Sequence, residues 1–486
     1  MVFSSLIFLF RFLPIALLLY YIVPKKCRNA VLLIMSLVFY TWGEQGYVLI
    51  MIFSTIINYA YGILIGYLKR RDSVVKAKVT VIFSVITNLS VLCYFKYADM
   101  IIRGINSIIG NSDINILNVA LPIGISFYTF QTMSYTIDVY RGNVKVQKNI
   151  ISFATYVTMF PQLIAGPVVR YGTIENDLKH RKETESLFAE GVERFITGLG
   201  KKVLIANNVG LLWSQIQNMN TEGMTIITAW IGILAYTFQI YFDFSGYSDM
   251  AIGLGKMFGF NFNENFNYPY ISKSITEFWR RWHISLSSWF KEYVYIPLGG
   301  NRVGILKHIR NIMAVWILTG LWHGANANFI LWGLYYGIIL IVEKFVLKPV
   351  YLKIFKNENK RNNILVNIIR HIYSMIIIIF GWIIFSFNSL AKVKDYAKLM
   401  LGMGTNVISI YNRYTIYLLY TNIILLIVAT LGATPIPSQI IKYIENNIHN
   451  DIIKTIVKNV FYIIIFILSV AYIVDSTYNP FLYFKF

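Results

Sequence analysis

The feature that most constrains this sequence is a series of long apolar runs separated by short polar connections. Most of the runs are about as long as an α-helix that crosses the roughly 30 Å hydrocarbon core of a bilayer. They occupy residues 3–23, 31–42, 47–68, 79–97, 119–140, 188–213, 226–257, 312–346, 366–387, 415–431 and 457–474. The run at 312–346 is long enough for two helices with a break near Gly324. The sequence therefore predicts an all-α integral membrane protein with roughly eleven or twelve crossings.

Composition and charge agree with a membrane location. The chain of 486 residues is 56% hydrophobic and 14% charged, whereas soluble domains are about 45–50% apolar and about 25% charged. Its 44 Lys and Arg exceed its 23 Asp and Glu, which gives a net charge of +21. These cations form short clusters between the apolar runs, as in cytoplasmic membrane loops. We therefore expect contact with membrane lipid and no nucleic-acid partner.

The positive clusters also predict an orientation. Lys25, Lys26 and Arg28 follow the first apolar run, and a second cluster at 69–78 follows the third. Positively charged loops face the cytoplasm, so the N-terminus is expected outside, and an even number of crossings places the C-terminus outside as well. The first run lacks a small-residue cleavage site and is expected to remain as a span. No linker or repeat divides the chain, which favours one membrane domain over residues 1–486.

Two further segments are apolar but poorly suited to simple spanning helices. Residues 150–169 are interrupted by Pro161, Gly166 and Pro167, and residues 285–300 are short and end in a Pro-Leu-Gly-Gly sequence. Broken backbone at membrane depth is tolerated only where protein or a water-filled cavity satisfies its polar groups. These segments are therefore either re-entrant segments that line an internal cavity or helices that lie flat at the membrane surface.

A histidine within an apolar run is the sharpest candidate for chemistry. His323 lies in the 312–346 run, where a polar side chain is costly and so points to function. On a helix, Thr319, Gly320, Asn326 and Ala327 would share its face and leave room for a substrate beside the imidazole. Imidazole titrates near neutral pH and is the best general base among side chains. The alternative is a structural histidine at a helix crossing where the glycines allow close approach.

A second candidate is the segment 277–293, which predicts one amphipathic helix at the cytoplasmic surface. One stripe of this helix would carry Trp279, Trp282, Leu286, Trp289 and Tyr293, and another would carry Arg280, His283, Ser287 and Lys291. The segment is either a basic entrance for an anionic donor such as coenzyme A or an interfacial helix anchored by tryptophans.

Other ionisable residues give weaker signals. Asp243 and Asp249 lie near the end of an apolar run, and we expect at least one to be paired, for example with the nearby arginine cluster. Cys27 and Cys93 stand in no metal-binding spacing, so no metal site is expected. The motifs of zinc proteases, P-loop ATPases and serine hydrolases are not found in the sequence.

Several ordered motifs resemble the membrane-bound O-acyltransferases, especially the branch of the bacterial alginate O-acetyltransferases. They are Trp279-Arg280-Arg281-Trp282-His283-Ile284-Ser285-Leu286, Tyr295-Ile296-Pro297-Leu298-Gly299-Gly300-Asn301-Arg302, Gly320-Leu321-Trp322-His323-Gly324, Asp243-Phe244-Ser245-Gly246-Tyr247-Ser248-Asp249, the opening Met1-Val2-Phe3-Ser4-Ser5, Tyr40-Thr41-Trp42-Gly43-Glu44 and Tyr478-Asn479-Pro480-Phe481. The resemblance spans nearly the whole chain and thins between about residues 389 and 474. It favours a functional His323 over a structural one.

The resemblance implies a ring of membrane helices with re-entrant segments and a central tunnel, with a catalytic core at about 119–346. It implies that His323 is the active-site histidine and His283 the second characteristic position. We assign substrate or donor binding to Arg280, Arg281, Trp282, Ser287, Trp322 and Asn326. The implied reaction moves an acetyl group from a cytoplasmic donor, acetyl-CoA, with no tightly bound cofactor. The acceptor is an extracellular polysaccharide, reached through an extracellular SGNH-type acetyltransferase partner in the bacterial cell membrane.

Two alternatives stay open at this point. A D-alanyl transferase of teichoic acids has a similar core but a carrier-protein donor, and the Pro297–Arg302 continuation and the length favour acetyl transfer. A transporter or flippase would more often show inverted repeats or several buried carboxylates, and neither pattern is found.

Overall fold

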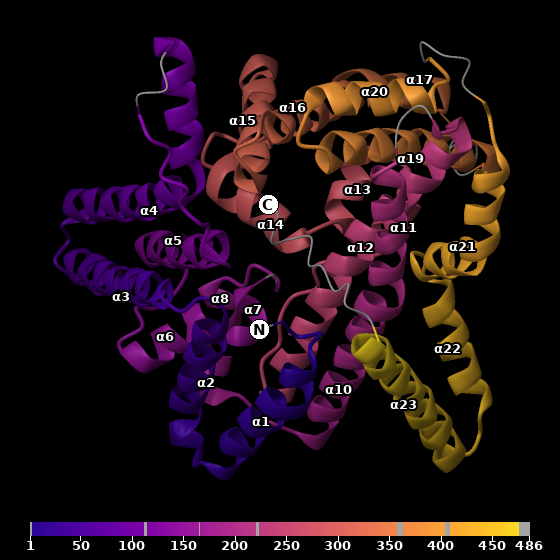
Figure 1. Ribbon diagram of the computed structural model, residues 1–486. Coiled ribbons are helices and arrows are strands. Elements are labelled where there is room, and N and C mark those ends of the chain that lie inside the picture. The colour runs from indigo at the N-terminus through magenta and orange to yellow at the C-terminus, as the bar shows by residue number, and fades with distance from the viewer. Residues whose placement is uncertain are drawn as a thin grey trace. The chain divides into compact units, whose positions relative to one another are not determined.

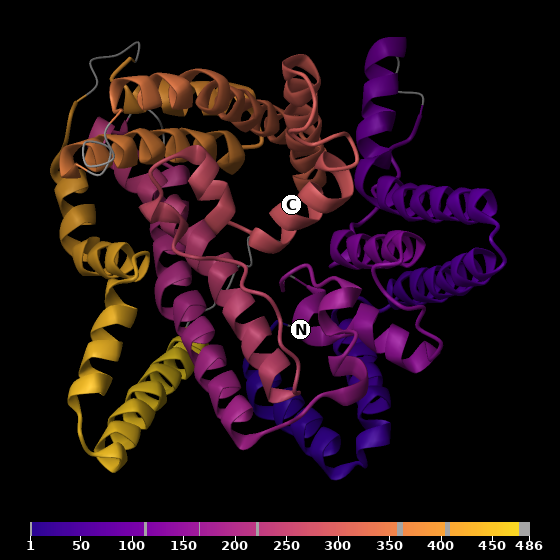
Figure 2. The same ribbon diagram turned by 180° about the vertical axis from the view of Figure 1, so that it is seen from behind.

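The computed structural model describes residues 2–110, 114–164, 166–219, 223–356, 363–403 and 409–475, and every regular element in these ranges is a helix (Figures 1 and 2). The chain divides into two compact units. Unit 1 comprises Met1–Gly198 and Tyr247–Glu264, and unit 2 comprises Leu199–Gly246 and Asn265–Phe486. The closing motif at 478–481 lies outside the described residues.

Seven helices among the described residues are long and apolar enough to cross a membrane. They are Val48–Arg70, Val74–Ile109, Ile226–Met257, Ala327–Ile354, Ile364–Ser386, Arg413–Gly432 and Asp451–Asp475. Other predicted spans form shorter or interrupted helices, such as α2 (Arg28–Gly43) in the 31–42 run and α5 (Ile125–Arg141) in the 119–140 run. The all-α membrane class is confirmed, and the count of eleven or twelve crossings stays a prediction.

Unit 1 contains α1 (Leu13–Ile22), α2, α3 (Val48–Arg70), α4 (Val74–Ile109), α5, α6 (Ile150–Thr158), α7 (Phe160–Leu163), α8 (Tyr171–Ile174), α9 (Asp177–His180) and most of α10 (Glu185–Gly200). Helices α3, α4 and α5 lie side by side (Figures 1 and 2). Buried polar side chains join them: Asn58 Nδ2 donates to Asn88 Oδ1 at 3.0 Å, and the Ser84 hydroxyl donates to Thr136 at 3.0 Å. Such bonds hold helices together where lipid supplies little hydrophobic drive.

A buried ion pair ties the start of α2 to the loop before α10, and a hydrogen bond from α1 joins it. The Arg28 guanidinium lies 2.7 Å from Glu183, and the Tyr20 hydroxyl donates to the same carboxylate at 2.7 Å. Burial alone would raise the pKa of Glu183, but the bonds from Arg28 and Tyr20 outweigh it and hold this pKa below its usual value. Arg28 therefore has a structural partner as well as a place in the first positive cluster.

This depressed pKa predicts an acid-sensitive contribution to stability. The contribution is full above the pKa of an unfolded glutamate, about 4.3, and is lost as the pH falls through the lower pKa of the folded protein. Glu183→Gln is expected to lower the melting temperature at pH 7, while Glu175→Gln, a change at the more exposed pair with Lys179, serves as the control. Melting in detergent from pH 7 to 3 measures the effect. If the difference in melting temperature between wild type and Glu183→Gln did not shrink below pH 4, the assignment to Glu183 would be contradicted.

Unit 2 holds α11 (Asn207–Gln217), the first part of α12 (Ile226–Met257), α13 (Ile275–Arg281), α14 (Ile284–Phe290), α15 (Ile305–His323), α16 (Ala327–Val342), α17 (Lys348–Ile354), α19 (Ile364–Ser386), α20 (Leu390–Met400), α21 (Arg413–Gly432), α22 (Ile436–Asn447) and α23 (Asp451–Asp475). Its core is rich in tryptophan and tyrosine, with Trp332, Trp382 and Tyr336 almost fully buried. The predicted break near Gly324 is confirmed, because α15 ends at His323 and α16 begins at Ala327.

The two apolar segments that were predicted to be irregular are broken, as expected. Within residues 150–169, α6 and α7 are separated at Met159, and residues 166–169 form no regular element. Residues 285–300 contain α14, a π-helical turn at Lys291–Tyr295 and a tight turn where Gly299 and Gly300 have positive φ angles of 103° and 56°. Glycine adopts this left-handed backbone without the steric cost that a Cβ would add.

Candidate active site

His323 stands at the open end of α15 among aromatic rings. It is the last residue of the helix, because Gly324 adopts extended backbone with φ −178° and ψ 170°. The ring centroids of Trp332 and Phe385 both lie 5.1 Å from the imidazole centroid. The side chain is half-buried, with Nδ1 in the protein interior. An imidazole held by apolar walls and still partly open is suited to act on a substrate.

The predicted helical face around His323 is only partly correct. Thr319 and Gly320 share α15 with it, but the helix ends before Asn326 and Ala327, so these two do not continue the same face. Gly320 does not open a space for substrate either. A Cβ at this position would meet the backbone of Phe329 on α16, so the glycine permits close packing of α15 on α16. Asn326 is exposed in the connection between the two helices.

The prediction of one amphipathic helix over 277–293 is wrong. Helix α13 ends at Arg281 and α14 begins at Ile284, with Trp282 and His283 between them. His283 adopts left-handed backbone with φ 43°, which an uninterrupted helix does not allow. Trp282 and Trp289 are 4% and 3% exposed, so they are core residues rather than membrane-surface anchors. The two rings pack against other aromatic rings of unit 2, and this burial stabilises the broken helix relative to a straight helix at the membrane surface.

His283 is fixed by Asn265, to which the sequence analysis assigned no role. Its Nδ1 lies 3.0 Å from Asn265 Oδ1, which also accepts from the Ser285 backbone N–H at 3.2 Å and from the Ser285 hydroxyl at 2.8 Å. A backbone N–H can only donate, so Oδ1 is the acceptor of this cluster and His283 Nδ1 carries the proton. The lone pair is therefore on Nε2, which is buried and has no hydrogen-bond partner among the described residues.

Burial keeps His283 neutral. The side chain is 2% exposed, and removal from water lowers its pKa to about 3. Its ring centroid lies 6.0 Å from that of Trp322, which lies 4.9 Å from that of His323. The structure thus brings the two sequence-predicted histidines to the same tryptophan, although α14 and most of α15 lie between them in the chain. Two imidazoles beside one tryptophan place two groups that can carry a proton in one aromatic site.

The predicted donor-binding residues divide into exposed and structural ones. Arg280 is exposed at the end of α13. The Arg281 guanidinium instead lies 3.0 Å from Glu277 and donates to the Asn267 carbonyl at 3.1 Å. The Ser287 hydroxyl donates to the Trp279 carbonyl at 3.3 Å. Of the two arginines, Arg280 is therefore the one available to a ligand.

Further cations lie close to Arg280, and the sequence analysis did not single them out. The charges of Lys348 and Arg280 both act on the Lys344 ammonium. Lys344 Nζ also donates to His308 Nε2 at 2.9 Å, and the Tyr295 hydroxyl lies 2.8 Å from the same nitrogen. Arg280, Lys344 and Lys348 form a group of positive charges, which we call the α13 cation cluster. It attracts anions through its summed field.

Glu343 anchors the start of α13. Its carboxylate accepts the backbone N–H of Ile275 at 2.6 Å and the N–H and hydroxyl of Thr276 at 2.8 and 2.7 Å. A carboxylate at a helix N-terminus satisfies free N–H groups and complements the helix dipole. In the sequence, the feature that could have pointed to Glu343 is its position beside Lys344 at the end of an apolar run. Glu343 thus holds the helix whose other end carries Arg280.

The two aspartates of the 243–249 motif are both paired, as expected, but with other partners than the arginine cluster. Asp243 lies 2.5 Å from Lys202 within unit 2, and both side chains are 3% exposed. Asp249 lies 2.6 Å from Arg194 within unit 1. Among the described residues, no three His, Cys, Asp or Glu side chains are grouped closely enough to hold a metal ion. The aspartates have structural roles, since both carboxylates are neutralised by cations.

Comparison with known proteins gives the class. The profile of the membrane-bound O-acyltransferase (MBOAT) family matches residues 37–386, which include α13 to α16 and both histidines. The chain belongs to this family and is a multi-pass membrane O-acyltransferase.

Individual relatives narrow the class to O-acetylation. The chain is 45% identical over 419 residues to the probable alginate O-acetylase AlgI of Pseudomonas aeruginosa. This match covers 85% of this chain and 77% of the relative. It is 38% identical to the protein of that name from Pseudomonas putida, with 100% of both chains covered. It is 36% identical to the peptidoglycan O-acetyltransferase of Helicobacter pylori, with 71% of this chain and 70% of the relative covered. The resemblance to the O-acetylating branch is confirmed.

Proposed function

We propose that this protein moves an acetyl group from cytoplasmic acetyl-CoA across the membrane for O-acetylation of an extracellular polysaccharide. The observation that carries the proposal is the pair His323 and His283 beside Trp322, in a chain related to O-acetylases of alginate and peptidoglycan. An extracellular SGNH-type acetyltransferase completes the transfer to the glycan. The protein acts in the bacterial cell membrane and needs no tightly bound cofactor.

The chemistry is acyl transfer from sulfur to oxygen. The acceptor hydroxyl attacks the thioester carbonyl while His323 takes its proton, and collapse of the tetrahedral intermediate forms the ester and releases coenzyme A, whose thiolate recovers the proton. Trp332 supports the developing oxyanion: its Nε1–H is buried, has no acceptor among the described residues and belongs to a ring 5.1 Å from His323. General-base assistance contributes typically about 10²- to 10⁴-fold.

Purified protein with radiolabelled acetyl-CoA tests this function. We expect label to appear in a transferred or hydrolysed acetyl product, and His323→Ala to remove it at equal expression. Acetyl label that stayed on coenzyme A in the presence of the partner and glycan, together with transfer of labelled D-alanine from a D-alanyl carrier protein, would replace acetyl transfer with D-alanyl transfer. Movement of intact substrate across proteoliposomes without acyl transfer would point to a transporter.

We place the donor entrance at the α13 cation cluster, because the phosphates of coenzyme A gain from several nearby positive charges. Arg280→Gln is expected to raise the apparent KM for acetyl-CoA several-fold with little change in kcat, and the effect should shrink at high salt. Arg281→Gln is the matched control, since Glu277 already holds that guanidinium. The test is to measure KM for acetyl-CoA and kcat of wild type and both variants at two ionic strengths. A fall in kcat with unchanged KM would place Arg280 at the chemical step instead.

We also propose that both termini lie outside the cell, from the positive clusters at 25–28 and 69–78. A small epitope at either terminus should then be labelled in intact cells whose outer barriers admit the probe. An epitope in the loop from Lys353 to Arg361, which is predicted to be cytoplasmic, should be labelled only after permeabilisation. The reverse pattern would invert the proposed direction of acetyl transfer.

A further inference from the structure

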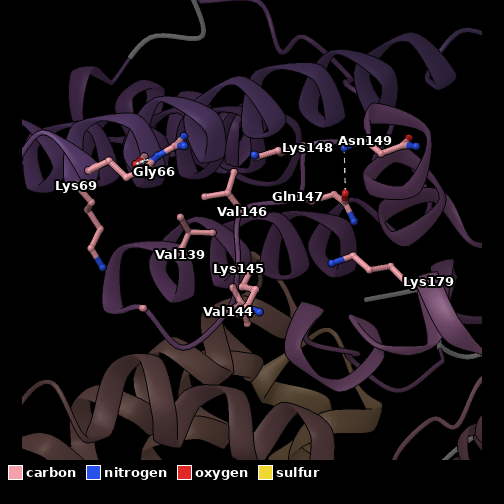
Figure 3. A pocket seen from close by; sticks show the side chains of 12 residues that line it. Gly66, Lys69, Val139, Val144, Lys145, Val146, Gln147, Lys148, Asn149 and Lys179 are labelled. Atoms are coloured by element: carbon pink, nitrogen blue, oxygen red, sulfur yellow. Dashed lines mark hydrogen bonds between the residues drawn. The ribbon is translucent and has the colours of Figure 1, made fainter.

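An open pocket of about 630 Å³ lies within unit 1 (Figure 3). Its walls come from the last turns of α3 and α5, from the segment 142–149 that follows α5, and from Lys179 of α9. Five of its twelve lining residues are cations, namely Lys69, Arg70, Lys145, Lys148 and Lys179, and none of the twelve is acidic. The pocket therefore has an excess of positive charge.

The contacts of these cations leave most of that charge uncompensated. Lys69 Nζ donates to the Tyr140 carbonyl at 2.7 Å, and Arg70 Nε donates to the Gly66 carbonyl at 3.2 Å. These neutral acceptors fix the side chains without cancelling their charge. Lys179 lies 3.8 Å from Glu175 in an exposed pair, which screens it only weakly. Like charges gathered around one hollow favour an anionic ligand.

The pocket is held in shape by a set of hydrogen bonds. Gln147 is buried: its backbone N–H donates to the Tyr135 hydroxyl at 3.0 Å, and its Oε1 accepts from the Asn149 backbone N–H at 2.9 Å (Figure 3). The Tyr59 hydroxyl donates to the Lys148 carbonyl at 2.5 Å. A Cβ on Gly66 would collide with the Val146 side chain, so the segment packs directly on α3. The backbone that carries Lys145 and Lys148 is thus fixed before a ligand arrives.

The outer surface of α3 shows where the ligand comes from. Its exposed apolar side chains recur every three or four residues: Leu49, Phe53, Ile56, Ala60, Leu64 and Tyr67. Such a stripe on a helix of 23 residues that is apolar enough to span a membrane faces lipid. The next position of the stripe is Arg70, which is exposed and lines the pocket. The pocket therefore opens where the lipid-facing stripe ends, at the level of phospholipid headgroups.

We propose that this pocket binds the phosphate of an anionic phospholipid, with the acyl chains lying along the α3 stripe. Lys145 and Lys148 contact the phosphate from the 142–149 segment, while Lys69 and Arg70 contact it from α3. A soluble phosphate compound offers the same charge but gains nothing from the apolar stripe, which is why the lipid is the ligand. The site is independent of acetyl transfer, and its test uses lipid binding rather than activity.

Binding of short-chain phosphatidylglycerol and phosphatidylcholine to the purified full-length protein tests the proposal, with the two lipids matched in chain length. Titration followed by native mass spectrometry gives both affinities. Wild type is expected to prefer phosphatidylglycerol, and Lys145→Gln/Lys148→Gln to lose about fivefold in that affinity for each cation removed. The matched control is Lys25→Gln/Lys26→Gln, which removes the same charge from exposed positions of unit 1 outside the pocket.

Three results would overturn the proposal. Equal affinity of the wild type for the two lipids would show that the pocket does not select an anion. An equal loss in the control variant would show that only net charge matters. Competition by inorganic phosphate or coenzyme A at concentrations similar to that of the lipid would assign the pocket to a soluble phosphate compound. Unchanged melting temperatures in both double variants ensure that the lost affinity does not reflect unfolding.

Discussion

His323→Ala is expected to abolish acetylation of the glycan in cells and to lower acetyl transfer by the purified protein by about 10²- to 10⁴-fold, the contribution of a general base. The imidazole can take the acceptor proton, and it stands at the end of α15, where Gly324 adopts extended backbone. The variant should still fold, because the ring is only half-buried and its loss removes part of the aromatic packing at the end of α15.

Two comparisons make this expectation specific. His449→Ala, a change of an exposed histidine in the connection before α23, should leave transfer unchanged. His283→Ala should be milder than His323→Ala, or should act partly through donor binding. Near wild-type transfer by His323→Ala at equal expression, together with loss in His283→Ala, would reverse the roles of the two histidines. A similar melting temperature for all three variants excludes unfolding as the cause.

Features set by local sequence could be predicted well. Long apolar runs require helices in a membrane, and the length of the 312–346 run predicted a break near Gly324 that the structure shows after His323. Prolines and glycines likewise predicted the irregular path at 150–169. These features depend on backbone chemistry within a few residues, which a sequence pattern contains.

Features set by distant residues could not be predicted in this way. The 277–293 segment has a helical pattern throughout, yet Asn265 holds His283 in left-handed backbone and so divides the segment into α13 and α14. Glu343, from the end of α16, supplies the cap at the start of α13. Nothing within the segment encodes these partners, because tertiary contacts overrode its local preference.

The dependence of His283 on Asn265 leads to the second large expected effect. Asn265→Ala removes the acceptor of three hydrogen bonds at once, so the His283 Nδ1–H and the Ser285 N–H lose their partner in the protein interior. Each buried donor left in this way costs about 1–3 kcal/mol, and the imidazole can turn or change tautomer. Misplacing a reacting group by about 1 Å can cost 10²-fold, so we expect a loss of about that size in transfer.

Asn265→Asp separates positioning of His283 from general destabilisation. An aspartate keeps an oxygen for the His283 and Ser285 donors, so it should restore much of the activity that Asn265→Ala loses. Its negative charge favours protonated His283 and raises the pKa of that imidazole from its low value. Protonation occupies Nε2, so the acid side of the activity profile should move to higher pH in Asn265→Asp than in wild type. Full pH profiles of kcat and melting temperatures for both variants provide the measurement. If Asn265→Ala kept wild-type transfer, or if Asn265→Asp showed no shift in its acid limb, Asn265 would hold the backbone between α13 and α14 without setting the state of His283.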